Sequence, residues 1–300
     1  MSWFGFWRRK RADSTQAAGP ARHIGGRRFA AGVPYLLPSD LGETNRLDFQ
    51  HYMLRSALKG NYAAPLNRPQ DILDVGSGSG RWAMEMARQF PDANVVGVDI
   101  APPAADAADA NDANDVRPDN YAFVQGNVLE HLPFADNSFD FVHQRLLVAA
   151  IPAARWPSVV AELLRVTRPG GWVELLEAES RLPNAGPGLQ TSMRWASALA
   201  GRRGIDPASA SQVGEFLRLA GAERIATRTI ALPVGERAGR LGAMAKADLL
   251  AGMSGLRGVV TSMGLISAPD FEINQRQIEG ELSSGRISWP FYIAFGQKPR

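Results

Sequence analysis

The chain has 300 residues, of which 45% are hydrophobic and 21% charged, with no cysteine and a net charge of +3. This composition is typical of a globular protein and excludes a disordered chain. The lack of cysteine excludes disulfides, thiolate metal sites and a thiol nucleophile. No apolar run approaches the roughly 20 residues that cross a bilayer, and no secretory signal pattern is present. We therefore expect a cytoplasmic protein.

The positive charge is concentrated near the amino terminus. Residues 1–28 contain seven basic residues and one acidic residue, whereas the remaining 272 residues contain 26 basic and 29 acidic ones, a net charge of −3. A mildly acidic body does not favour a nucleic-acid partner. Residues 1–28 predict a flexible tail. Four aromatic residues beside the basic run 8–11 leave peripheral membrane contact through residues 1–11 as an alternative.

From residue 71 onward, short runs rich in Val, Ile and Phe alternate with helical patterns. Strands are predicted at 71–76, 94–100, 121–126, 139–144, 171–178, 222–234 and 287–296. Helices are predicted at 40–59, 81–90, 156–168 and 209–220. Alternating strands and helices indicate an α/β fold, with a doubly wound, mostly parallel sheet covered on both faces. Further helical segments near 188–203 and 238–262 predict a helical cap, and the biased run 101–120 predicts a loop.

The segment Asp74-Val-Gly-Ser-Gly-Ser-Gly80 connects a buried-type strand to a helix. Glycines in such a turn allow a sharp bend and close approach of a ligand to the backbone. A dinucleotide loop that starts at Gly76 requires glycine at position 81, where Arg81 stands. Asp74 suits the ammonium group of a methionine moiety better than a pyrophosphate. These differences favour S-adenosylmethionine over a dinucleotide, with Asp74, Gly76, Ser77 and Gly78 as contacts.

The next two strands end in polar residues that suit the rest of that ligand. Asp99, followed by Ile100, ends the second strand, where a carboxylate can accept hydrogen bonds from both ribose hydroxyls. Asn127 follows the third strand and can meet the adenine edge while Val128 packs against the ring. A helix-capping or turn role remains the alternative for Asp99 and for Asn127.

The fourth strand, Phe139–Arg145, ends where the methyl and carboxylate groups of this donor would lie. Arg145 or Gln144 is a candidate contact for the carboxylate. His143 is a weak candidate for a general base, because a single histidine in a strand is also compatible with a hydrogen-bonded core position. The sequence contains no metal-binding motif of the H-E-x-x-H type, no Walker loop and no G-x-S-x-G, so we expect no metal site.

The motifs Asp74-Val-Gly-Ser-Gly, Val98-Asp99, Gly126-Asn127, Phe139–Val142 and Arg168-Pro-Gly-Gly-Trp-Val-Glu resemble those of class I S-adenosylmethionine-dependent methyltransferases. The upstream block Tyr35–His51 resembles the subgroup of fungal secondary-metabolism regulators, often described as trans-aconitate-methyltransferase-like. This resemblance implies a Rossmann-like seven-stranded sheet with an antiparallel last strand. It also implies donor contacts at Asp74, Gly76, Gly78, Asp99 and Asn127. Asn127 departs from the commoner Asp, which weakens the adenine assignment.

The block around residues 40–51 also has a purely structural interpretation. Asp40 and Glu43 have the spacing of a helix N-terminal cap, and Glu43 can instead contact a ligand. Arg46 is a candidate donor contact and His51 a second weak catalytic candidate; a surface or intrahelical pair is the alternative for both. We thus expect a tail at 1–28, a helical cap segment at 29–60 and a methyltransferase domain at 61–300.

We expect this domain to methylate an oxygen, nitrogen or carbon of a small-molecule metabolite. No catalytic triad is needed, because the protein must mainly align the acceptor and exclude water. A donor-binding regulator of secondary metabolism with weak or no activity is the alternative. An NAD-dependent oxidoreductase is a third possibility. The acceptor and the oligomeric state cannot be read from the sequence.

Overall fold

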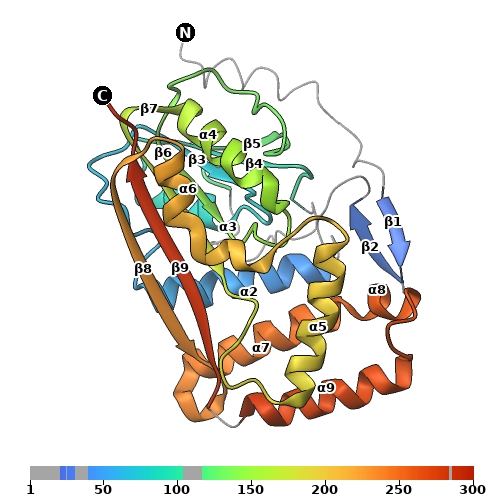
Figure 1. Ribbon diagram of the computed structural model, residues 1–300. Helices are drawn as coiled ribbons and strands as arrows, with labels where there is room; N and C mark the ends of the chain where they lie inside the picture. The colour runs from blue at the N-terminus through green and yellow to red at the C-terminus, as the bar shows by residue number, and fades with distance from the viewer. Residues whose placement is uncertain (1–20, 25, 31–39, 104–116, 284–285) are drawn as a thin grey trace.

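The computed structural model describes residues 21–24, 26–30, 40–103, 117–283 and 286–300. Its centre is a seven-stranded sheet of order β5-β4-β3-β6-β7-β9-β8 (Figure 1). Strand β9 runs in the direction opposite to the other six strands of this sheet. The predicted fold is thereby confirmed. The strands are β3 (Asp71–Val75), β4 (Asn94–Asp99), β5 (Tyr121–Gln125), β6 (Phe139–Arg145), β7 (Thr167–Ala178), β8 (Glu223–Pro233) and β9 (Ser288–Gln297).

Helices cover both faces of this sheet. Helix α3 (Arg81–Gln89) buries Trp82 and Met86 against one face, because residues four apart lie on the same side of a helix. Helices α4 (Trp156–Val166) and α6 (Val213–Leu219) pack on the other face, where the rings of Trp156 and Phe216 stack at 5.2 Å. The apolar strands are thus buried from both sides, as a parallel sheet requires. The 3-10 segments are Ala153–Arg155, Pro207–Gln212 and Glu236–Ala238.

A second group of helices lies beyond the sheet's edge. Figure 1 shows α2 (Leu41–Leu58) crossing between the sheet and this group, which is drawn lowest in the view. Its members are α5 (Pro187–Gly201), α7 (Gly239–Gly255), α8 (Arg257–Ser262) and α9 (Ala268–Ser283). The sequence predicts α2 and α5 closely. It predicts α7 and α8 as one helix, whereas the structure separates them at Leu256.

Helix α9 was not predicted from the sequence. Its core-facing residues, Phe271, Asn274, Ile278 and Leu282, follow helical spacing but include one polar residue. The start carries a recognisable signal, because Ser267 Oγ accepts a hydrogen bond from the Asp270 backbone N–H at 3.2 Å. A serine followed three residues later by an acid is the usual sign of a helix N-terminus.

The prediction of a flexible tail over residues 1–28 is wrong for the carboxyl-terminal end of this segment. Strands β1 (Ala21–Ile24) and β2 (Arg27–Ala30) form an antiparallel hairpin. Phe29 is buried in an apolar cluster with residues of α5, α8 and α9. Arg27 pairs with Asp40, the N-cap of α2, through contacts of 2.7 and 2.5 Å. These tertiary contacts order a segment that has no periodic signal of its own. Residues 1–11, with their proposed membrane contact, lie outside the described residues.

Strand β7 also begins earlier than predicted. Helix α4 ends at Val166 and the strand starts at Thr167, whose hydroxyl donates to the Leu163 carbonyl at 2.7 Å. Gly170 adopts a φ of 79°, and the pairing register between β6 and β7 shifts at this point. The Pro-Gly-Gly sequence, predicted to end a helix, is therefore an irregularity inside a strand.

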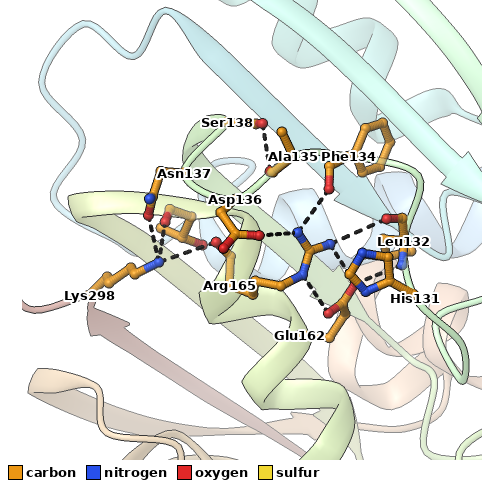
Figure 2. A network of polar contacts seen from close by, with 11 residues as sticks. His131, Leu132, Phe134, Ala135, Asp136, Asn137, Ser138, Glu162, Arg165 and Lys298 are labelled. Atoms are coloured by element: carbon orange, nitrogen blue, oxygen red, sulfur yellow. Dashed lines mark hydrogen bonds and ion pairs between the residues drawn. The ribbon is translucent and has the colours of Figure 1, made fainter.

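A polar network fixes the sheet edge at which β6 begins (Figure 2). The Arg165 guanidinium contacts Glu162 at 2.7 Å and Asp136 at 2.7 Å, and it donates to the Phe134 carbonyl at 2.9 Å. Lys298 joins the same region by donating to Asn137 Oδ1 at 2.8 Å. The network ties α4, the loop before β6 and the segment after β9 together, so we assign it a structural role. In the described part of the chain, no helix has the length and apolar character needed to cross a bilayer.

Candidate functional site

The candidate site lies at the carboxyl ends of β3, β4 and β6. The chain proceeds outward from β3 to β4 and β5 on one side, and from β6 to β7 on the other. The strand order reverses next to β3, and α/β proteins bind their ligands at the carboxyl edge of the sheet at such a point. The predicted donor contacts Asp74, Asp99 and Arg145 all lie on these strands.

The glycine loop after β3 is held tightly against β4. The backbone N–H groups of Gly76 and Ser77 both donate to the Val98 carbonyl, at 2.8 and 3.1 Å. Gly76 has a φ of 69°, and a Cβ at this position would lie 2.7 Å from a methyl carbon of Leu147. The positive φ and the position of Leu147, in the loop that follows β6, therefore favour glycine at position 76. A Cβ at Gly78 would lie 3.1 Å from Leu47, so α2 covers the loop from the other side.

Asp99 at the end of β4 is directly bonded to this loop. One carboxylate oxygen accepts the Gly78 N–H at 2.8 Å, and the other accepts the Ala101 N–H at 3.3 Å. Desolvation raises the pKa of Asp99 above its ordinary value, although these N–H groups oppose the shift. Ile100 follows, and its carbonyl accepts the Gln125 side-chain amide at 2.9 Å. The carboxylate thus lies at the glycine loop, with lone pairs left for further donors.

Asp74 and His143 form a buried pair on adjacent strands. His143 Nδ1 lies 3.0 Å from Asp74 Oδ1, and the two residues are only 1% and 2% exposed. The imidazole stacks on Trp82 with ring centroids 3.8 Å apart and planes 5° apart. Burial lowers the pKa of His143 and outweighs the opposing effect of Asp74. The imidazole is therefore neutral, with Nδ1 as the donor to Asp74.

Arg145 brings a cation to the same edge. Burial lowers the pKa of its guanidinium, while Asp74, Glu85 and Asp48 act in the opposite direction. Within the described ranges, none of these carboxylates forms an ion pair with Arg145. A guanidinium held in this way is available to an anionic group of a ligand. Gln144 points elsewhere, since its amide donates to Glu177.

Helix α2 carries the other two predicted residues, and the structure gives both of them protein partners. Arg46 contacts Glu43 at 2.6 Å and the buried Asp248 of α7 at 2.8 Å. His51 Nε2 lies 3.2 Å from Glu85 Oε2 of α3. Burial lowers the pKa of His51, against the opposing effect of Glu85. Arg46 therefore joins two helices, while His51 is a buried, neutral imidazole.

The surface next to His51 is hollowed between α2 and α3. A pocket of about 480 Å³ is lined by Tyr52, Arg55, Asn61, Glu85, Arg88 and Gln89. Its lining is polar and includes both acidic and basic side chains. Arg81, at the position where a dinucleotide loop has glycine, closes the neighbouring part of this helix pair through a 2.7 Å contact with Asp48.

Asn127 lies in a local turn after β5. Its side-chain oxygen accepts the Leu129 N–H at 3.0 Å, and its amide nitrogen donates to Glu130 at 3.1 Å. Val128 is partly buried against the core on the α4 side of the sheet. The adenine contact predicted for Asn127 would therefore have to compete with these turn contacts, whereas Val128 keeps an apolar surface at the strand end.

Comparison with known proteins gives the family. A sequence model described as a methyltransferase domain matches residues 72–171. Methyltransferase str3 of Strobilurus tenacellus is 38% identical over 169 residues, covering 54% of this chain and 56% of that protein. N-methyltransferase sirN of Leptosphaeria maculans is 32% identical over 225 residues, covering 72% of this chain and 76% of that protein. The chain belongs to the methyltransferase family.

Two further similarities fit this family. The secondary metabolism regulator laeA of Aspergillus flavus is 31% identical over 161 residues, covering 50% of this chain and 38% of that protein. An O-methyltransferase family protein from Burkholderia thailandensis shares the fold with a TM-score of 0.50 and 13% identity, covering 86% of this chain and 59% of that chain. The chain spans only about half of the length of str3, one of the curated relatives that it matches.

Several residues of this methyltransferase-family site were missed by sequence reasoning. Trp82 supports His143, Leu47 and Leu147 contact the glycine loop, and Glu177 of β7 binds the loop after β6. Apolar residues such as Leu47 carry no distinguishing signal. Glu177 does carry one, since an acid within the apolar strand pattern Trp-Val-Glu-Leu-Leu-Glu-Ala must find buried donors.

Proposed function

We propose that the protein is an S-adenosylmethionine-dependent methyltransferase acting on a small-molecule metabolite. The observation that carries the proposal is the bond from the Gly78 N–H to Asp99, in a loop where Gly76 has a positive φ and lies beneath Leu147. This arrangement suits a ribose lying over the glycine loop with its hydroxyls at Asp99. Membership of the methyltransferase family supports the same ligand.

The charged groups at this edge suit the amino-acid end of the donor. Asp74 provides a carboxylate that can bind the ammonium group of the donor, and one of its oxygens already contacts His143. Arg145 is a cation for the carboxylate. Arg46, by contrast, would reach the donor only by exchanging its bonds to Glu43 and Asp248. We therefore place Arg145 in direct contact with the donor and give Arg46 the role of fixing α2 above it.

The donor supplies a methyl group on a positively charged sulfonium, which an acceptor displaces in line. The chain's own task is to align the two molecules and exclude water. Leu47 above Gly78 and Leu147 above Gly76 cover the glycine loop with apolar side chains. His51 and His143, both neutral, are the two imidazoles able to take a proton from an acceptor. Each imidazole has one ring nitrogen beside a carboxylate, and His143 is in addition stacked on Trp82, so His51 is the candidate to test first.

A nitrogen atom of an apolar metabolite is the acceptor to test first. The relative sirN is named an N-methyltransferase, and the helices beyond the sheet edge pack around an apolar core cluster. This cluster includes Met53 and Leu54 of α2, with Met193 and Met253 packed against it. Flexible methionine side chains adapt readily to an irregular apolar ligand. Oxygen and carbon acceptors remain within the proposal.

A donor-binding regulator with weak or no catalysis is the second candidate. The similarity to the secondary metabolism regulator laeA favours it, although this similarity covers only half of the chain. The two candidates share the donor site and differ in whether a methyl group is transferred.

The test combines binding with transfer. Calorimetry with S-adenosylmethionine, S-adenosylhomocysteine and NAD⁺ should give binding of the first two and none of NAD⁺. Incubation with methyl-labelled donor and metabolite extracts should then give labelled small molecules. Donor binding without any labelled product would favour the regulator, whereas NAD⁺ binding without donor binding would refute both candidates.

A further inference from the structure

Strand β7 carries two carboxylates that are completely buried, Glu174 and Glu177. Each accepts hydrogen bonds from two successive backbone N–H groups of a neighbouring loop. Glu174 accepts from Ala63 and Ala64, at 2.8 and 2.7 Å. Glu177 accepts from Leu147 and Val148, both at 2.9 Å. Both carboxylates thus bind backbone N–H groups, but they hold different loops.

The loop held by Glu177 is the one that touches the glycine loop. Leu147, whose N–H is bound by the carboxylate, packs its side chain over Gly76. Gln144, just before Arg145 at the end of β6, donates its amide to the same carboxylate. The contacts of Glu177 therefore reach two sides of the predicted donor site, through Leu147 and through the end of β6. The loop held by Glu174 packs instead in the cluster around Trp82 and Phe141.

We propose that the Glu177 carboxylate is a positioning residue for the donor, because it holds the loop after β6 in the place where Leu147 covers Gly76. The proposal rests on the proposed function, since it concerns affinity for the same donor. An ionised carboxylate can accept hydrogen bonds from Gln144, Leu147 and Val148 at once. A protonated carboxyl has one oxygen that carries a proton, and therefore binds the loop less strongly.

This difference makes donor affinity depend on pH. Burial raises the pKa of Glu177 to about 7, and the bonds from Gln144, Val148 and Leu147 oppose the shift. Tyr292 of β9 lies opposite Glu177 in the pairing register, and Arg145 follows Gln144 in β6. Neither residue contributes to the raised pKa of Glu177. The 3-10 segment Pro207–Gln212, which packs on β7, contains no titratable residue. Within the described elements, the site imidazoles His51 and His143 have lowered pKa values and stay neutral near pH 7.

The experiment measures S-adenosylhomocysteine affinity between pH 6 and 8 in three proteins. For the wild type, the Kd should rise about tenfold when the pH is lowered from 8 to 6. Over this range, which spans the pKa of Glu177, the ionised fraction of its carboxyl falls about tenfold. Glu177→Gln should bind about tenfold more weakly at pH 8 and lose this pH dependence, because one backbone N–H loses its acceptor. Glu174→Gln, the matched control, should keep the wild-type pH dependence, although burial raises the pKa of Glu174 to about 7 as well.

A second measurement needs no variant and therefore survives poor folding of Glu177→Gln. If donor binding favours the ionised carboxyl, the wild type must release protons to the buffer on binding at pH 7, which calorimetry in two buffers of different ionisation enthalpy detects. A pH-independent Kd with no proton release would overturn the proposal, and so would loss of the pH dependence in Glu174→Gln alone. Failure of the wild type to bind at any pH would refute the proposed function itself. Binding with wild-type behaviour of Glu177→Gln would refute only the role of Glu177.

Discussion

Asp74 and His143 are neighbours in register on the parallel strands β3 and β6, and their side chains meet at 3.0 Å in the interior. The pair joins the glycine loop, which Asp74 precedes by two residues, to α3 through the stacked ring of Trp82. The Trp82 indole in turn donates to the Asn61 carbonyl at 2.7 Å. The contact with His143 therefore orients the Asp74 carboxylate, which we predict to bind the ammonium group of the donor. The protonation state of His143 can be measured.

We predict that His143 titrates below the ordinary histidine pKa, and that Asp74→Asn lowers its pKa further. Burial lowers the pKa, and the Asp74 carboxylate is the first group that opposes this effect. Because its folded-state pKa is lowered, His143 stays neutral in the native protein while the unfolded chain takes up a proton. The associated stability is therefore present above about pH 6.5 and falls as the pH decreases. Titration of the imidazole by NMR in the wild type and in Asp74→Asn measures both shifts. A higher pKa in Asp74→Asn would contradict the assigned contact.

We predict that Asp99→Ala weakens S-adenosylhomocysteine binding by about 1 to 3 kcal/mol, the range expected when hydrogen bonds to a buried group are lost. Asp99→Asn keeps an oxygen for the Gly78 N–H and therefore preserves the loop while removing the charge. It should bind more tightly than Asp99→Ala. Calorimetry gives both affinities, and wild-type affinity in Asp99→Ala would remove this residue from the site.

The sequence was sufficient for the sheet and for the carboxyl-edge residues, because alternation of strands and helices determines where each strand ends. Asp74 and Asp99 are found at strand ends for that reason alone. The partners of Arg46 could not be predicted, since Asp248 lies 202 residues further along the chain and meets Arg46 only when α7 packs on α2. The hairpin of β1 and β2 could not be predicted for the same reason, because Arg27 pairs with Asp40, the N-cap of α2.

Two other features were within reach of the sequence. The spacing of Ser267 and Asp270 indicates the start of α9, and Phe271, Ile278 and Leu282 follow helical spacing after it. Glu174 and Glu177 stand in the apolar part of β7, Trp172–Ala178, among Trp, Val, Leu and Ala. A buried carboxylate requires hydrogen-bond donors, so their position alone predicts contacts with backbone N–H groups, although not with which loop.

We predict that Gly76→Ala destabilises the protein by about 2 to 5 kcal/mol and abolishes donor binding. The positive φ costs an alanine about 1 to 2 kcal/mol, and crowding against Leu147 adds about 1 to 3 kcal/mol. The double variant Gly76→Ala/Leu147→Ala removes the crowding but not the backbone strain. It should therefore recover part of the stability lost in Gly76→Ala. Urea denaturation measures each step, and a double variant no more stable than Gly76→Ala would show that Leu147 does not limit the loop.

We predict that Asp248→Ala lowers the free energy of unfolding by about 1 to 3 kcal/mol, because it removes one of the two carboxylates that pair with Arg46 and the acceptor of the Gln50 amide, while Glu43 remains bound to Arg46. The loss should be much larger than that of Glu215→Ala, which breaks an exposed pair with Arg218 and should leave the stability unchanged. If α2 holds the donor loop as the contact of Leu47 with Gly78 indicates, S-adenosylhomocysteine should also bind more weakly to Asp248→Ala at a temperature where the variant remains folded. Urea denaturation and calorimetry together decide this. Unchanged affinity despite reduced stability would mean that the α2–α7 connection supports the fold without supporting the site.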